Sequence, residues 1–125
     1  MSERLRAIVE ALEVRPNDAI LEIGCGHGVA ATFICQKLKG GRLLAIDKSK
    51  KMIDAAARPN KECIEAGNAE FLLADVMKFD PGRQRFNKIL AVRVGLLHRD
   101  EDQARRHLEK WLKPRGKILL VYDEP

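Results

Sequence analysis

Short apolar runs alternate along the chain with segments whose apolar residues recur at helical spacing. The runs do not alternate with polar residues, which is typical of strands covered on both faces. They lie at 19–23, 43–46, 71–74, 86–92 and 117–122, and predicted helices lie at 2–15, 28–39, 50–57, 61–66 and 100–112. This order predicts an α/β domain with a doubly wound parallel sheet, helices on both faces and right-handed crossovers.

Several of these boundaries carry local end signals. Ser49 and Asp100 are suitable N-cap residues, and Gln103 stands where a capping partner of Asp100 belongs. Pro16 ends the first predicted helix, and Pro59 breaks or restarts the third, since proline suits a first helical turn. These residues therefore mark where several of the predicted helices begin or end.

Three glycines follow the first apolar run directly. Glu22, Gly24, Gly26 and Gly28 form the pattern E-x-G-x-G-x-G, and a predicted helix begins after them. Glycine lets the backbone turn tightly and lets a ligand approach it closely. A strand, a glycine turn and a helix N-terminus together form a cradle for a nucleotide-like ligand. The dinucleotide pattern G-x-G-x-x-G fails here, because Val29 stands where its third glycine belongs.

An aspartate follows each of the next two apolar runs. Asp47 lies 23 residues after Gly24, and an acidic residue about 20 residues past the glycines can accept both ribose hydroxyls. The alternative for Asp47 is an ordinary strand-end residue that caps the next helix. Asp75 follows the third run in the same way. The carboxyl ends of parallel strands share one edge, so the glycine turn and both aspartates are expected in one cleft.

The glycine pattern resembles motif I of the class I S-adenosylmethionine-dependent methyltransferases, and the ordered set of strand-end residues strengthens the resemblance. The family has a Rossmann-like sheet in the order 3-2-1-4-5, binds S-adenosyl-L-methionine and releases S-adenosyl-L-homocysteine. The resemblance implies that Asp75 accepts the adenine amino group and that Val76 offers its N–H and its side chain to the ring. The cofactor-binding residues it implies are Glu22, Gly24, Cys25, Gly26, Gly28, Asp47, Lys48, Met52, Asp75, Val76 and Val92. It names no catalytic residue and no metal ligand.

The sequence departs from this family in three places. Asn87 stands where an acidic residue is usual, at a position expected to be structural. The signature N/D-P-P-Y/F of DNA amino-methylating members is absent after Val92, so that chemistry is not supported. The family continues past the fifth strand, so the acceptor half is expected to be incomplete and methyl transfer by residues 1–125 alone weak or absent. The sequence does not identify the methyl acceptor.

His98 has two possible roles, as a base near the methyl group or as a residue that makes a local contact at a helix start.

Composition is typical of one soluble globular domain, residues 1–125. Of the 125 residues, 46% are apolar and 33% charged, and no apolar run approaches the ~20 residues of a membrane span. With no long apolar signal region at its start, the chain is expected in the cytoplasm. The net charge of +5 is concentrated at 83–117, which hold 11 Lys and Arg against four acidic residues. That surplus fits solvated basic surfaces or a nucleic-acid-binding module on the same fold.

Cysteine usage argues against a disulfide framework and against a zinc site. Cys25, Cys35 and Cys63 are odd in number and scattered, with no C-x-x-C spacing. Cys25 is interpreted as a small residue that fits the glycine turn, with a nucleophile as the alternative.

Two further possibilities follow from the same patterns. An NAD-dependent oxidoreductase would also use the glycine turn and Asp47, although Val29 and Asp75 count against it. The run 118–122 is apolar, yet in the order 3-2-1-4-5 it lies at the sheet edge. An open apolar edge invites another chain, so a homodimer through the fifth strand is expected.

Overall fold

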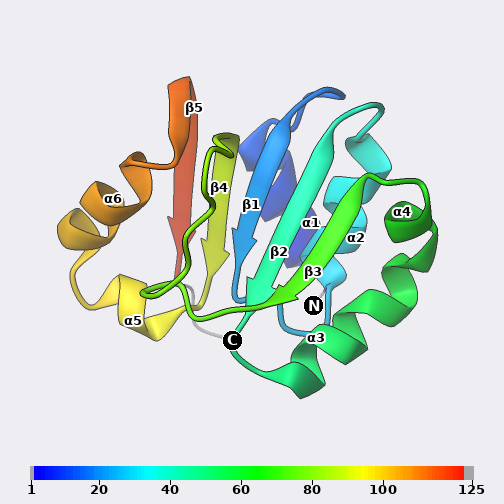
Figure 1. The fold of residues 1–125 in the computed structure, drawn as a ribbon, viewed down its shortest axis with the longest axis horizontal. Helices are drawn as coiled ribbons and strands as arrows, with labels where there is room; N and C mark the ends of the chain where they lie inside the picture. Colours follow the sequence, from blue (N-terminus) through cyan, green and yellow to red (C-terminus); the bar gives the residue numbers. More distant parts are fainter. Residues whose placement is uncertain (1, 123–125) are drawn as a thin grey trace.

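A parallel sheet of five strands lies at the centre of the computed structural model, which describes residues 2–122 (Figure 1). The strand order is β3-β2-β1-β4-β5, which confirms the predicted topology. The elements in chain order are α1 (Ser2–Leu12), β1 (Ala19–Ile23), α2 (Val29–Lys37), β2 (Arg42–Asp47), α3 (Lys50–Ala57), the 3₁₀ helix η1 (Arg58–Asn60), α4 (Lys61–Glu65), β3 (Ala69–Leu73), β4 (Phe86–Val92), α5 (Gly95–His98), α6 (Glu101–Glu109) and β5 (Leu112–Val121).

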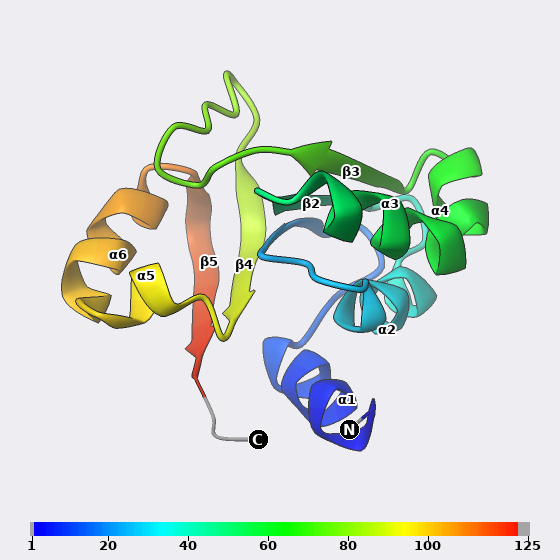
Figure 2. The same ribbon diagram turned by 90° about the horizontal axis from the view of Figure 1, so that it is seen from below.

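Helices lie on both faces of the sheet (Figure 2), and the sheet separates two apolar layers. Helices α1 and α2 cover one face, where Ile20 and Leu90 are fully buried. Helix α6 covers the other face, where Leu21 and Ile89 pack with Trp111. Consecutive residues of β1 thus enter opposite layers, which explains why the central strands are apolar throughout.

The crossover from β3 to β4 is a loop, residues 74–85, which contains no helix. It crosses the face that α6 also covers (Figure 1). Val76 and Phe79 belong to the apolar layer there, and the Phe79 ring meets Trp111 edge-on at 5.5 Å between centroids. Trp111, which lies just beyond α6, is therefore a core residue.

Two strands begin two or more residues earlier than the apolar runs predicted. β3 starts at Ala69 and β5 starts at Leu112. In β5 the added residues 112–116 contain an irregularity inside the strand, where the pairing with β4 shifts register between Phe86 and Lys88. Arg115 adopts a φ of 66° there. Backbone pairing thus continues through polar residues that break the apolar pattern.

A buried polar cluster joins β1 to β4 at the edge where both strands begin. Lys88 Nζ lies 2.7 Å from Asp18 Oδ2 and also donates to the Glu13 carbonyl at 3.1 Å. The Ala19 N–H donates to Asn87 Oδ1 at 2.7 Å, which gives Asn87 the expected structural role. This cluster lies at the opposite edge of the sheet from the carboxyl ends of the strands.

Cys35 of α2 and Cys63 of α4 form a disulfide, although the number and scatter of the cysteines argued against a disulfide framework. Their separation of 28 residues matches no spacing motif, and two helices on one face of the sheet bring them together. Cys25 is a buried free cysteine, in agreement with its interpretation as a small residue of the turn.

Candidate functional site

The glycine turn joins β1 to α2 and is tied to the end of β2. The N–H groups of Gly24 and Cys25 donate to the Ile46 carbonyl at 2.8 and 3.1 Å. Gly24, Gly26 and Gly28 have φ values of 73°, 53° and 84°, which L-residues with side chains rarely adopt. The pattern of alternating glycines therefore reflects three left-handed backbone positions.

Two of these glycines also allow a close approach of other elements. A Cβ on Gly24 would lie 2.7 Å from Val94 Cγ2, beyond β4. A Cβ on Gly28 would lie 2.9 Å from the backbone of Ala56 in α3. The turn thus fits closely between β4 and α3, and a substitution at either glycine would push them apart.

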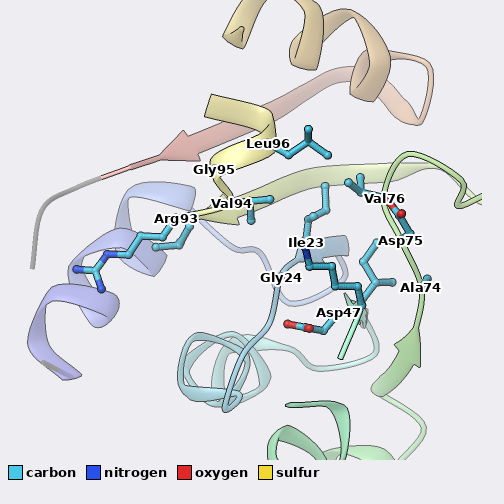
Figure 3. Close-up of a pocket in the computed structure, with 13 residues that line it drawn as sticks. Ile23, Gly24, Asp47, Ala74, Asp75, Val76, Arg93, Val94, Gly95 and Leu96 are labelled. Atoms are coloured by element: carbon cyan, nitrogen blue, oxygen red, sulfur yellow. The ribbon is translucent and has the colours of Figure 1, made fainter. Parts of the chain in front are cut away.

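A pocket of about 330 Å³ opens at the carboxyl ends of β1, β2, β3 and β4 (Figure 3). Six predicted cofactor-binding residues line it: Gly24, Asp47, Lys48, Asp75, Val76 and Val92. The other five, Glu22, Cys25, Gly26, Gly28 and Met52, are not among its lining residues. The residues at the strand ends thus lie together in one cleft, as the sheet topology predicted.

The Asp47 carboxylate already has two backbone partners. Its Oδ2 accepts from the Gly26 N–H at 3.1 Å, and its Oδ1 accepts from the Ser49 N–H at 2.9 Å. Ser49 in turn caps α3 by accepting from the Met52 N–H at 3.3 Å. A carboxylate has about four lone-pair sites, so Asp47 can order the turn and still accept from a ligand.

Asp75 and Val76 form the opposite wall of the pocket. Asp75 is exposed, and its Oδ1 accepts from the Met77 N–H at 2.9 Å, which shapes the start of the loop. Val76 is buried, and its carbonyl lies 3.2 Å from His107 Nε2 of α6. This wall is therefore held by a hydrogen bond within its own loop and by a contact with α6, which covers the same face of the sheet.

Beneath the turn lies a buried carboxyl group. Glu22 is only 4% exposed, and its Oε1 has no hydrogen-bond partner among the described residues. Burial, together with the negative charge of Asp47, raises the pKa of Glu22 to about 8. Burial, followed by the charges of Glu22 and Asp47, raises the pKa of the Cys25 thiol to about 12. Cys25 is thus a thiol and not a thiolate at neutral pH, which argues against a nucleophile there.

The segment after β4 contributes lining residues that the predicted site did not contain. Arg93, Val94, Gly95 and Leu96 line the pocket. Arg93 has a φ of 58°, and its guanidinium points away from the pocket toward α1, whereas Val94 and Leu96 face it (Figure 3). The only sequence signal for them is their position, directly after a buried strand.

His98 lies at the end of α5 and makes local contacts. Its Nδ1 is 2.9 Å from Glu101 Oε2, and its ring stacks on Tyr122 with 4.5 Å between centroids. It is not among the residues that line the pocket of about 330 Å³. These contacts favour the local role over that of a base.

Several basic residues of 83–117 have partners within the chain. Lys88 pairs with Asp18, Lys117 with Glu13 at 3.2 Å, and Arg105 donates to the Ile118 carbonyl at 3.3 Å. Arg83 and Arg85 precede β4, at the edge of the sheet opposite the pocket. Part of the basic surplus therefore stabilises the fold.

Within residues 2–122, no group of three or more His, Cys, Asp and Glu side chains is placed to hold a metal ion. The helices of the same residues include none long and apolar enough to cross a membrane.

A family model described as a methyltransferase domain matches residues 20–116. Phosphoethanolamine N-methyltransferase 1 of Zea mays is 31% identical over 120 residues, which cover 95% of this chain and 23% of that protein. A crystal structure of coclaurine N-methyltransferase bound to N-methylheliamine and SAH has a TM-score of 0.80 at 21% identity, over 94% of this chain and 34% of that one. The [4+2]-cyclase SpnF has a TM-score of 0.77 at 23% identity, over 94% and 43%.

The two structural likenesses show the fold alone, and the cyclase shows that this fold also serves another reaction. The chain spans between 23% and 63% of the length of eight curated relatives that it matches. The family model, however, matches more than three quarters of the chain, and it does so across the glycine turn and both strand-end aspartates. The chain therefore belongs to the family of class I S-adenosylmethionine-dependent methyltransferases.

Proposed function

We propose that this chain binds S-adenosyl-L-methionine in the pocket at the carboxyl ends of the strands, for transfer of its methyl group to an acceptor. One observation carries the proposal: Gly24, Asp47 and Asp75, which the family pattern assigns to one cofactor, line one pocket. Coclaurine N-methyltransferase, which has the same fold, is described with the demethylated product SAH.

The described residues fit this cofactor chemically. The unpartnered Glu22 Oε1 lies beneath the turn, outside the lining of the pocket, and is proposed as an acceptor for the ammonium group of the methionine part, whose positive charge would favour the ionised form of this carboxyl group. The free lone pairs of Asp47 suit the ribose hydroxyls, and the exposed Asp75 carboxylate suits the adenine amino group. Val76 and Leu96 give the pocket apolar surface suited to the adenine ring. Lys48 and Val92 line the same pocket.

The bound cofactor would supply a sulfonium-linked methyl group, which an acceptor attacks in line. The residues of this chain contribute positioning, since holding two reactants in the right geometry can supply much of the acceleration. Asp47 orders both the glycine turn and the start of α3 through its two backbone contacts. Val94 packs on Gly24 and fixes the wall next to the methionine part. No described side chain is assigned as an acid or base.

A calorimetric titration with S-adenosylhomocysteine, run beside NAD, tests the cofactor. Saturable binding of S-adenosylhomocysteine without binding of NAD is the expected result. Binding of NAD alone would replace the assignment with an oxidoreductase. The maize relative is named for methylation of an amine, so amines are the first acceptors to test.

A nucleic-acid-binding module that uses this fold only as a scaffold is the second candidate, and the basic residues of 83–117 support it. Arg83 and Arg85, however, lie at the edge of the sheet opposite the pocket, so a strand bound there would not reach the methyl group. Strongly salt-dependent RNA binding that does not need the cofactor would favour this candidate.

A cytoplasmic location and a homodimer through β5 belong to the same proposal. The homodimer is supported by the position of β5 at the edge of the sheet. The disulfide Cys35–Cys63 bears on the location, because cytosolic disulfides are usually transient and catalytic or redox-sensing. Cell fractionation with an antibody to this chain tests the compartment directly.

A further inference from the structure

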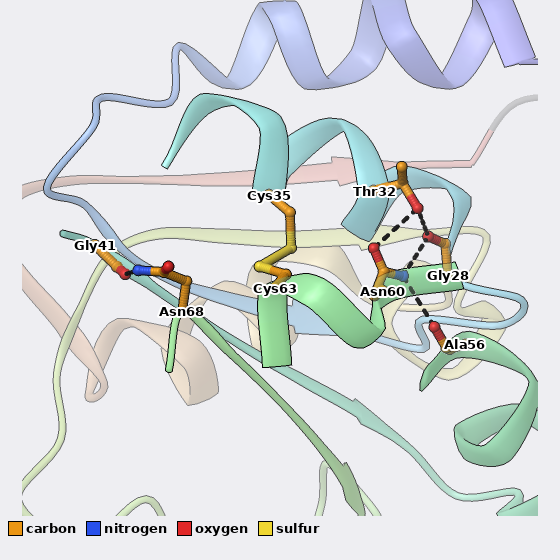
Figure 4. The surroundings of a disulfide bond; sticks show 8 residues. All are labelled: Gly28, Thr32, Cys35, Gly41, Ala56, Asn60, Cys63 and Asn68. Atoms are coloured by element: carbon orange, nitrogen blue, oxygen red, sulfur yellow. Dashed lines mark hydrogen bonds between the residues drawn. A yellow bond between two sulfur atoms is a disulfide. The ribbon is translucent and has the colours of Figure 1, made fainter. Parts of the chain in front are cut away.

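Two links, one covalent and one a hydrogen bond, join helix α2 to the segment η1–α4 (Figure 4). One link is the disulfide between Cys35 and Cys63. The other is a hydrogen bond of 3.0 Å from Thr32 Oγ1 to Asn60 Oδ1. Each residue of the second link lies three positions before its counterpart in the disulfide, so the two links are neighbours, one helical turn apart, along the same helix interface.

The hydrogen-bonded link holds the glycine turn directly. The Gly28 carbonyl accepts from Thr32 Oγ1 at 3.0 Å and from Asn60 Nδ2 at 3.2 Å. Asn60 is only 3% exposed and also donates to the Ala56 carbonyl at 2.9 Å. The position of η1 therefore fixes the last glycine of the turn, and Gly28 also packs on the backbone of Ala56.

The disulfide is the covalent part of this interface. The segment α3–η1–α4 follows Asp47 in the chain, packs against Gly28 at Ala56 and is held at its far end by Asn68 Nδ2, which donates to the Gly41 carbonyl at 2.7 Å. Without the bond between the sulfurs, the contact of α4 with α2 would rely on non-covalent packing. Asn60 would then hold the turn less firmly.

We propose that Cys35 and Cys63 form a thiol–disulfide switch that sets the affinity of the glycine turn for the cofactor. The proposal rests on the proposed function, because the rigidity of the glycine turn can change an affinity only if the turn binds a ligand. The reaction needs one small-molecule disulfide such as oxidised glutathione. The two cysteine thiols give up two electrons and two protons, one S–S bond forms between them, and two molecules of reduced glutathione leave. Both cysteines are only half-buried, so an exchange reagent can reach them.

Titration calorimetry with S-adenosylhomocysteine on the oxidised and the reduced chain is the first test. A typical coupling between two sites changes affinity by about fivefold or more, so the oxidised chain should bind at least about fivefold more tightly. Circular dichroism of the reduced chain verifies that it is folded at the titration temperature. Equal affinities in the two states would overturn the switch and leave the proposed function intact, whereas no binding in either state would overturn both.

The second test uses the unmutated chain and needs no titration. Coupling between two sites is reciprocal, so S-adenosylhomocysteine must favour the disulfide by the factor by which the disulfide favours binding. The chain is equilibrated in a glutathione redox buffer, quenched with N-ethylmaleimide under denaturing conditions and weighed by mass spectrometry. The oxidised chain takes one label, on Cys25, and the reduced chain takes three. An unchanged ratio at saturating ligand would refute the coupling.

Single variants provide the matched controls. Cys35→Ser and Cys63→Ser each remove the crosslink and keep the other thiol, so both should bind with the affinity of the reduced chain in either buffer. A redox response that survives in these variants would assign the effect to Cys25 and contradict the proposal. A reduced chain that is unfolded at every temperature would also contradict it, because the bond would then serve the fold instead of the site.

Discussion

Asp47 connects the glycine turn, the start of α3 and the pocket through one side chain. Replacing it with alanine removes a charged acceptor, so we expect Asp47→Ala to weaken binding of S-adenosylhomocysteine by about 1–3 kcal/mol. Calorimetry measures this loss. Asp54→Ala is the matched control, because Asp54 lies exposed on α3 and pairs only with Lys50 at the surface. Equal binding by a folded Asp47→Ala chain would show that the carboxylate serves only its backbone partners Gly26 and Ser49 and holds no ligand.

The buried Glu22 makes stability depend on pH. Its pKa is about 8 in the folded chain against an ordinary 4.5, so the folded state binds more protons than the unfolded state between these values. The free energy of unfolding therefore falls as pH rises from about 4.5 toward 8, and the stability that the protonated group allows is fully present only below that window. Urea unfolding at a series of pH values between 5 and 8 measures the slope.

Glu22→Gln keeps the shape of the side chain and removes the titration. We expect this variant to lose most of the downward slope and to be at least as stable as the parent near pH 8, because no charge is then forced into the core. A slope that is unchanged in Glu22→Gln would assign the pH dependence to another group.

At the residue level, prediction succeeded where position along the chain fixes the environment. Asp47 and Asp75 directly follow buried strands, so the topology alone places them at the pocket. The missing hydrogen bond of Glu22 could not be predicted, since it depends on which groups of α2 and β2 lie opposite. The burial of Lys88 could not be predicted either, because tertiary packing places its ammonium group against Asp18.

The link between β1 and β4 depends on the Asp18–Lys88 pair, which is about 90% buried on both sides. Removing one partner of a buried pair leaves the other charge uncompensated, so we expect Lys88→Met to lower the free energy of unfolding by about 3–5 kcal/mol. Denaturant unfolding measures this loss. Lys50→Met removes one partner of the exposed Lys50–Asp54 pair and should change stability by less than about 1 kcal/mol. Comparable losses in the two variants would contradict the importance of burial.

At the element level, strongly patterned segments were predicted and irregular ones were not. The caps at Ser49 and Asp100 accept from the backbone N–H groups of Met52 and Gln103, as their positions predicted. The helix α5 was missed, because four residues that begin with Gly95 carry no periodicity. The Cys35–Cys63 bond was missed because pairing depends on how α2 and α4 pack, which spacing does not encode.

The exposed edge of the sheet leads to a prediction for the whole molecule. β5 pairs with β4 on one side and has no neighbouring strand on the other among the described residues. Unpaired backbone N–H and C=O groups at such an edge favour pairing with a second chain, so we expect a two-fold homodimer with antiparallel β5 strands. Light scattering after size exclusion measures the mass. A single-chain mass across a wide concentration range would exclude the dimer.

For the whole molecule, the order of the strands and the convergence of their ends could be predicted, because both follow from the alternation of runs and the family resemblance. The shape of the pocket wall could not be predicted in the same way, because it depends on how the chain leaves β4. This wall contains Arg93, Val94 and Leu96. The left-handed backbone of Arg93 has no sequence signature, since it is not a glycine.

The pairing of β1 with β4 has a consequence for how the chain folds as it is made. Ala19 and Asn87, which bond across this pair, are 68 residues apart in the sequence. At a synthesis rate of about 5–20 residues per second, one edge of β1 waits roughly 3–14 s for its partner. During that time Ile20, Leu21 and Ile23 form an apolar strand with a bare edge. Until β4 emerges from the ribosome, this chain therefore exposes an unpaired apolar strand edge, which favours aggregation.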